Sequence, residues 1–122
     1  MKINDFYELD AWKESRKLVI ELYKQTAKFP KDEKYGISDQ LRRATSSVTA
    51  NIAEGFGRYH YKDKVKFYYN ARGSIKEVQN FIFLAKDLGY LSGNESKQIW
   101  EATKDCERLI NGLIKSANSQ KP

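Results

Sequence analysis

Cysteine, proline and histidine are scarce in this chain, and long apolar runs are missing from it. The single cysteine, Cys106, cannot form an internal disulfide, and one histidine, His60, leaves no ligand set for zinc. No apolar run approaches the roughly 20 residues that a membrane-spanning helix needs, and the first residues lack the apolar centre of a signal peptide. We therefore expect a cytoplasmic protein with no metal, no cofactor and no membrane segment.

Only two prolines, Pro30 and Pro122, interrupt the chain, so long stretches are free of helix breakers. Apolar residues recur at intervals of three and four, which is the spacing of amphipathic helices and not of strands. With 122 residues, of which 40% are hydrophobic, the chain has room for one domain with a real core. We expect a single all-α domain over residues 1–122.

Four helices are predicted, at about residues 10–28, 38–55, 62–88 and 93–116. Asp10 and Ser38 are placed to cap the first two helices, and Ser92 with Glu95 forms an S-x-x-E capping box for the last. Short connections favour neighbours that run in opposite directions. The predicted architecture is therefore an antiparallel up-down-up-down four-helix bundle.

Each predicted helix carries one apolar stripe. The expected core residues are Ala11, Ser15, Leu18, Val19, Leu22 and Thr26; Leu41, Ala44, Thr45, Val48 and Ile52; Phe67, Tyr68, Ala71, Ile75, Val78, Ile82 and Ala85; and Ile99, Ala102, Cys106, Leu109, Ile110 and Leu113. The stripe of the second helix has small neighbours that allow close packing. We expect Gly55 and Gly57 to end that helix, and Gly89 to end the third.

Positive charge is concentrated in residues 42–76, which hold eight cations against two anions, Glu54 and Asp63. The remaining segments are balanced, so this stretch accounts for the net charge of +6. Such clustering, with Tyr59, Tyr61 and Tyr69 interleaved, is typical of a surface that meets a polyanion, although a lysine-rich helix face is often only solvated surface. The candidate phosphate-binding residues are Arg42, Arg43, Arg58, Lys62, Lys66 and Lys76.

A second set of polar residues is expected to have a structural role. Asn51 and Glu54 lie beside the inner stripe of the second helix, where Arg72 and Glu77 of the next helix complete a satisfied network. The glycines that follow Glu54 do not form a phosphate loop, because such loops precede a helix and these glycines follow one.

No pattern for catalysis is present. Cys106 lies on the apolar stripe of the last helix, His60 lies in a turn, and Ser46 and Ser47 are more economically explained as small packing residues. We expect no catalytic residue and no enzymatic activity.

Several apolar residues fall outside the predicted core stripes, namely Ile20, Tyr69, Phe83 and Trp100. They point to surface that another copy of the chain covers. The alternative is a monomer with scattered exposed hydrophobic residues, which is common.

Three strings resemble a known family: Gln40–Ala44, Asn51–Arg58, and Ala71–Ser74 followed by Glu77. The chain is similar, from about residue 6 to residue 115, to the four-helix-bundle proteins encoded in intervening sequences of bacterial 23S ribosomal RNA genes. It is also similar to the accessory protein of diversity-generating retroelements, which works with nucleic acid and a reverse transcriptase. This chain departs from the family at Val48–Ala50, where an Ile-Pro pair is frequent, so we expect a continuous second helix.

The resemblance implies a ring-shaped homopentamer without catalytic activity and with a basic surface for RNA or DNA, at Arg42, Arg43, Arg58 and Arg72. The first hypothesis is therefore a non-enzymatic homo-oligomer that binds RNA or DNA through phosphate contacts. The alternative is an interaction scaffold whose basic face binds an acidic partner protein such as a polymerase. The sequence does not choose between RNA and DNA.

Overall fold

The computed structural model describes residues 2–120, and this part of the chain contains helices and no strand. The elements are η1 (Phe6–Glu8), α1 (Asp10–Thr26), η2 (Lys31–Glu33), α2 (Ile37–Phe56), α3 (Tyr61–Asp87) and α4 (Gly93–Asn118). The all-α fold is confirmed, and the ends of the four long helices lie within two residues of the predicted ones. α2 is continuous through Val48–Ala50.

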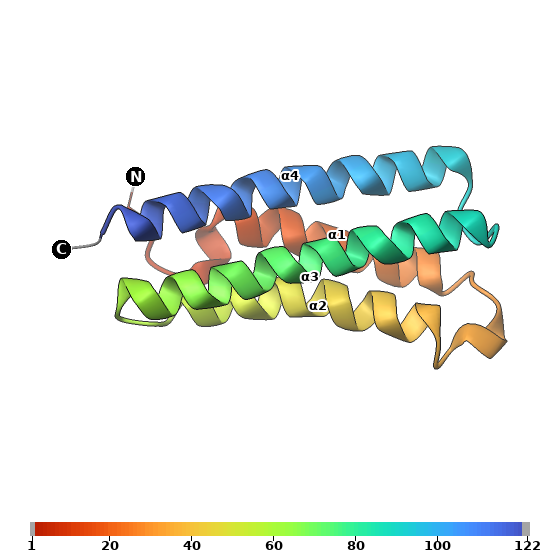
Figure 1. Ribbon diagram of the computed structural model, residues 1–122, viewed down its shortest axis with the longest axis horizontal. Coiled ribbons are helices and arrows are strands. Elements are labelled where there is room, and N and C mark those ends of the chain that lie inside the picture. The colour runs from red at the N-terminus through yellow and green to blue at the C-terminus, as the bar shows by residue number, and fades with distance from the viewer. Residues whose placement is uncertain (1, 121–122) are drawn as a thin grey trace.

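The four long helices pack as a bundle in which successive helices run in opposite directions (Figure 1). α2 and α4 each pack against both α1 and α3, so α1 and α3 occupy diagonal corners. The turn between α2 and α3 lies at the same end of the bundle as the C-terminus of α4 (Figure 1). No helix of residues 2–120 is both long and apolar enough to cross a membrane.

The prediction that Asp10 caps the first helix is wrong. The N-cap is Leu9, which offers no side-chain acceptor, and Asp10 is already the first helical residue. Its carboxylate there complements the positive end of the helix dipole instead. Asp5 acts as a cap one element earlier, where it forms a capping box with Glu8 at the start of η1.

The prediction for Ser38 is also wrong, because α2 begins one residue earlier, after Gly36, and Ser38 is buried inside the helix. The capping box of α4 is confirmed. The Glu95 amide donates to Ser92 Oγ at 3.0 Å, and the Ser92 amide donates to Glu95 Oε1 at 2.8 Å. The two bonds satisfy two amides at the helix start that have no partner within the helix.

The core follows the predicted stripes. All predicted core positions of α2 are buried, while one or a few residues on each of the other helices are half-buried: Val19, Phe67, Ala102, Leu109 and Leu113. Leu22, Leu41, Val48, Ile75 and Ile110 are fully buried at the centre.

Gly57 is the C-cap of α2, as predicted, whereas Gly55 does not end the helix, which continues to Phe56. A Cβ atom at Gly55 would lie 2.7 Å from Tyr68 Cε1 and 2.9 Å from Tyr68 Cδ1. Glycine is therefore needed here because α2 and α3 come too close for a side chain. Gly89 does follow the end of α3, with a φ of 80° that favours glycine.

Candidate nucleic-acid interface

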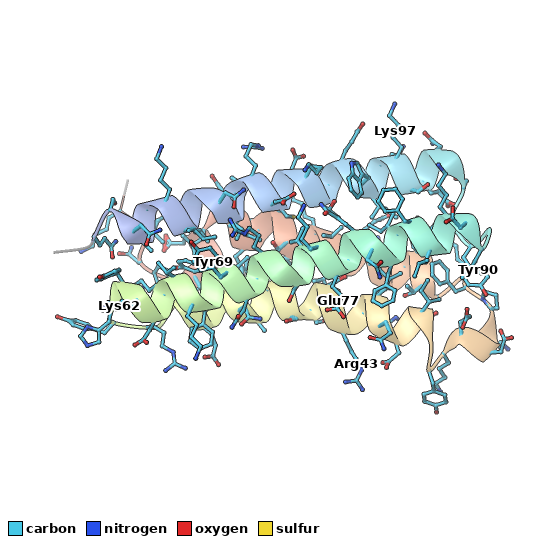
Figure 2. All side chains as sticks on the ribbon, viewed as in Figure 1. Arg43, Lys62, Tyr69, Glu77, Tyr90 and Lys97 are labelled. Carbon is cyan, nitrogen blue, oxygen red and sulfur yellow. The ribbon has the colours of Figure 1, made fainter. Side chains whose placement is uncertain are left out.

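The candidate cations are spread along the hairpin of α2 and α3. Arg58 lies in the turn, and Lys62 and Lys66 lie on the first two turns of α3, so these three residues share one end of the bundle. Figure 2 shows Lys62 at that end and Arg43 toward the other end of α2. With 1.5 Å per residue, the two ends of the set are about 20 Å apart along α2. The structure brings three of the six candidates together and leaves the others apart from them.

Three of the candidate cations form ion pairs. Arg43 pairs with Asp39 and Arg58 pairs with Glu54, both at 2.8 Å and both at exposed positions one helical turn apart. Exposed pairs of this kind contribute about 0–1 kcal/mol, so a competing phosphate can displace the carboxylate at little cost. Lys76 pairs with Glu107 at 2.8 Å, and the Glu107 side chain is only 13% exposed.

Arg42 is engaged inside the bundle. Its Nε donates to Thr26 Oγ1 at 2.8 Å, its Nη2 donates to the carbonyl of Tyr23 at 3.3 Å, and its guanidinium lies 4.6 Å from the centre of the Tyr23 ring. Both acceptors belong to the last turn of α1: one is the Thr26 hydroxyl, and the other is the Tyr23 carbonyl, which also accepts from the Ala27 amide at 3.1 Å. Arg42 therefore joins α2 to the C-terminal end of α1.

Lys62 and Lys66 are exposed and form no ion pair with any residue from 2 to 120. The nearby Lys64 has a different role, because its Nζ donates to the carbonyl of Phe56 at 2.7 Å and thereby caps the C-terminus of α2. Partial burial lowers the pKa of Lys64. The sequence does not predict that Lys64 caps α2 while Lys62 and Lys66 form no ion pair with the described residues, because the three lysines occupy every second position of one short segment.

The four residues of the predicted polar network do not hydrogen-bond to one another in the described part of the chain. Asn51 Nδ2 donates to the carbonyl of Ser47 at 2.8 Å, Glu54 pairs with Arg58, and Arg72 Nη1 donates to Asn111 Oδ1 at 3.0 Å. The partners thus lie within α2, in the turn that follows it, or on α4 across the seam. A role for these residues between subunits stays a prediction.

The register of the two helices explains why Glu77 does not reach Asn51. Ser74 Oγ donates to Ser47 Oγ at 2.9 Å, which places these two positions side by side. Because the helices are antiparallel, Glu77 lies level with Ala44, about 10 Å along the axis from Asn51. The Glu77 side chain is exposed, as Figure 2 shows.

A polar network that was not predicted from the sequence joins α3 to α4. Gln79 is buried and its Nε2 donates to Thr103 Oγ1 at 3.2 Å and to Glu107 Oε1 at 3.4 Å. Glu107 also accepts from Lys76 and from Lys104 at 2.8 and 3.1 Å. The hydrogen bond from Lys76, supported by those from Lys104 and Gln79, lowers the pKa of Glu107. The sequence does contain a signal for this network. Gln79 lies one turn after Ile75, so it is a polar residue on the buried face of α3 and needs a hydrogen-bond partner there.

The side chains that most often act as nucleophiles, bases or metal ligands do not form a reactive site in residues 2–120. Cys106 is fully buried, and burial raises the pKa of its thiol to about 11, so it is protonated at neutral pH and a poor nucleophile. His60 is exposed in the turn, and its ring lies nearly perpendicular to that of Tyr59, with the two centroids 5.0 Å apart. Residues 2–120 contain no group of three acidic, histidine or cysteine side chains arranged to hold a metal ion.

Comparison with known proteins identifies the family. A family model described as the 23S rRNA-intervening sequence protein matches residues 7–112, which is most of the chain. The chain belongs to this family. The resemblance seen in the sequence is thereby confirmed, and the family description states no enzymatic activity.

A solved structure shows the same fold. It is a crystal structure of a protein with unknown function from the S23 ribosomal protein family of Bacteroides thetaiotaomicron, with a TM-score of 0.80 and 18% sequence identity. The match covers 86% of this chain and 95% of that one. No curated protein matches this member of the intervening-sequence family.

Proposed function

We propose that the protein is a non-enzymatic, cytoplasmic homo-oligomer that binds RNA or DNA through phosphate contacts. The contacts are made by the turn between α2 and α3 and the start of α3, at Arg58, Lys62 and Lys66, which we call the hairpin tip. The observation that carries the proposal is that Lys62 and Lys66 lie side by side, one helical turn apart, without any acidic partner among residues 2–120.

Two further features of the hairpin tip support this proposal. Arg58 lies 4.6 Å from the centre of the Phe67 ring and forms an exposed ion pair with Glu54, and a phosphate can replace that carboxylate at little cost. Tyr59 is 89% exposed beside Arg58 and offers a ring on which an unpaired base can stack. Phosphate oxygens accept hydrogen bonds from arginine and lysine without regard to base sequence, so we expect little sequence preference.

The other candidate cations are ranked below the hairpin tip. Arg43 is exposed and held by an ion pair like that of Arg58, but it lies at the far end of α2. Lys76 neutralises a mostly buried carboxylate, and Arg42 holds two helices together, so releasing either would cost stability.

We propose that the oligomer is a pentameric ring. Exposed apolar side chains lie on the outer side of α1, at Ile20 and Tyr23, and at the C-terminal end of α3, at Leu84 and at the C-cap Leu88. Because α1 and α3 occupy diagonal corners, the two faces point in different directions. A contact between two different faces is head-to-tail, and head-to-tail contacts form a ring when the rotation from one copy to the next closes on itself.

Fluorescence anisotropy with labelled single-stranded RNA, single-stranded DNA and duplex DNA at two salt concentrations tests the proposal. The triple variant Arg58→Ala, Lys62→Ala and Lys66→Ala should lose most of its affinity, and the lost phosphate contacts should weaken its salt dependence. The matched control, Lys28→Ala, Lys31→Ala and Lys34→Ala, removes the same charge from the opposite end of the bundle.

Each result has a distinct meaning. Equal losses in the two triple variants would contradict a defined hairpin tip and indicate diffuse charge attraction. If the wild-type protein binds none of the probes in a salt-sensitive way, nucleic-acid binding is wrong. The scaffold for an acidic partner protein would then be the better explanation of the same basic face.

A further inference from the structure

An aromatic pair lies at the end of α3 opposite the hairpin tip. The rings of Phe83 on α3 and Trp100 on α4 have centroids 5.0 Å apart and planes inclined by 57°. Phe83 is 57% exposed, although an aromatic side chain of this size usually packs into a core. Phe83 therefore presents a large apolar surface that the bundle itself does not bury.

The two rings belong to a groove of about 300 Å³ between α3 and α4. Its remaining lining is Ile82, Lys86, Gly93, Ser96 and Lys97. Neither lysine forms an ion pair within the described residues, and Figure 2 shows Lys97 extending from α4 away from the bundle. The groove therefore combines aromatic walls with uncompensated positive charge at its edge.

The groove continues the side of α3 on which the hairpin tip lies. Lys62, Lys66, Tyr69 and Phe83 are spaced so that they lie on one side of the helix. Lys76 lies on the same side, but its charge is held by Glu107. The distance along this side from Lys62 to Phe83 is about 30 Å. Tyr69, one third of the way from Lys62 to Phe83, is exposed, and Figure 2 shows it at the seam between α3 and α4. The Arg72 guanidinium lies 4.8 Å from the centre of the Tyr69 ring.

We propose that this seam takes single-stranded nucleic acid, with an unpaired base in the groove against Phe83 and Trp100. Lys86 and Lys97 contact the flanking phosphates, and the strand runs past Tyr69 toward the hairpin tip. The inference rests on the proposed function, since it assumes that the tip binds the same strand. A duplex cannot use the groove in this way because its bases are stacked on one another, whereas every unpaired base has a free face.

Alternation of rings and cations over such a length favours a polynucleotide over an acidic peptide. A peptide with one apolar anchor would contact only the groove and the two lysines beside it. Its binding would not explain why Tyr69 and the hairpin tip lie on the same side of α3 as the groove. A strand that carries a phosphate and a base at every unit uses both kinds of side chain repeatedly.

The test uses Trp100 as a reporter. The chain has two tryptophans, so Trp12→Phe leaves Trp100 as the only one. Titration with a short oligothymidylate should quench its fluorescence, because the base stacks on the ring, and a duplex of the same length should bind without quenching. Phe83→Ala should weaken binding of the oligothymidylate about tenfold and leave duplex binding unchanged. The exposure of Phe83 makes this substitution compatible with folding, which circular dichroism verifies.

The outcomes separate the inference from the proposed function. If both probes bind, Trp100 is not quenched and Phe83→Ala has no effect, the groove is not a base site, while the hairpin tip remains a phosphate site. If neither probe binds, and the labelled RNA of the anisotropy assay does not bind either, both proposals are wrong. Quenching by an aromatic-containing polyglutamate peptide, and not by oligothymidylate, would overturn the inference in favour of a protein-docking groove.

Discussion

At the scale of single residues, Gly55 marks a place where α2 and α3 come too close for a side chain. A methyl group at this position would lie 2.7 and 2.9 Å from two ring carbons of Tyr68, which is buried and has little room to move. We expect Gly55→Ala to destabilise the protein by about 1–3 kcal/mol, because overpacking forces the ring or the helices to shift. Urea denaturation monitored by circular dichroism measures the change.

Gly73→Ala is the matched control for this substitution. Gly73 also lies inside a helix, but a Cβ atom there has no neighbour within 4 Å. Alanine should therefore stabilise α3 by about 0.5–1 kcal/mol through its higher helix propensity. The same chemical change should thus have opposite effects at two positions. Stabilisation by Gly55→Ala would show that the two helices separate without cost.

At the scale of elements, α3 and α4 are joined by Glu107 and its partners. Glu107→Gln removes the charge that holds Lys76 and Lys104 and should cost about 1–2 kcal/mol at neutral pH, because both lysines are half-exposed and solvent replaces part of the loss. The control is Glu101→Gln on the exposed side of α4, which should change stability by less than about 0.5 kcal/mol.

The cost of Glu107→Gln should depend on pH. The pKa of Glu107 is lower in the folded protein than its ordinary value. Its contribution is therefore complete above the ordinary pKa of a glutamate and is lost as the pH falls through the lowered one. Unfolding free energies of the wild type and the variant should converge in acid. A difference that stays constant with pH would show that the carboxylate is not charged when it binds the two lysines.

The helices themselves were predictable from the sequence, and their mutual contacts were not. Periodicity determined the four stripes, and local signals such as Ser92 with Glu95 and Gly89 determined helix ends, because these depend on neighbours in the chain. The network of Asn51, Glu54, Arg72 and Glu77 depended on the register of α2 against α3, which the Ser47–Ser74 contact sets and no local signal reveals. The contacts of Arg42 with α1 also depend on how the helices pack and not on neighbours in the chain, so the sequence indicated a surface cation at this position.

The sequence predicted the excess of cations in the basic segment, but it predicted only in part where their side chains lie in the fold. Its eight cations were expected to form a single zone, but three of the six candidate phosphate-binding residues lie together at the hairpin tip. Side-chain partners on α1 and α4 engage Arg42, Arg72 and Lys76. These partners are distant in sequence, so a count of charges along the chain includes cations that the fold has already used.

At the scale of the whole molecule, binding strength depends on how many hairpin tips act together. One tip offers three cations, so a single chain that binds through its tip alone releases few counterions and should bind nucleic acid weakly at physiological salt. A ring brings several tips onto one strand, and linked contacts of this kind raise the overall affinity by about 10²–10⁴. The proposed oligomer and the proposed nucleic-acid binding therefore depend on each other.

Ile20→Glu tests this dependence. Ile20 is 47% exposed on the apolar side of α1, so a carboxylate there should leave the bundle folded and be desolvated unfavourably at a contact between copies. We expect light scattering to show a monomer where the wild type has five times the chain mass. Anisotropy titrations should show affinity reduced by about a hundredfold or more and a shallower salt dependence, although the tip is unchanged.

Gln98→Glu, on the exposed side of α4, introduces the same charge away from this contact and should keep both the mass and the affinity of the wild type. If Ile20→Glu keeps the wild-type mass, α1 is not the contact face. If it becomes a monomer and still binds with the wild-type salt dependence, the contacts come from one chain alone, and the ring has no part in holding the nucleic acid. Only joint loss of mass, affinity and salt dependence supports several tips on one strand.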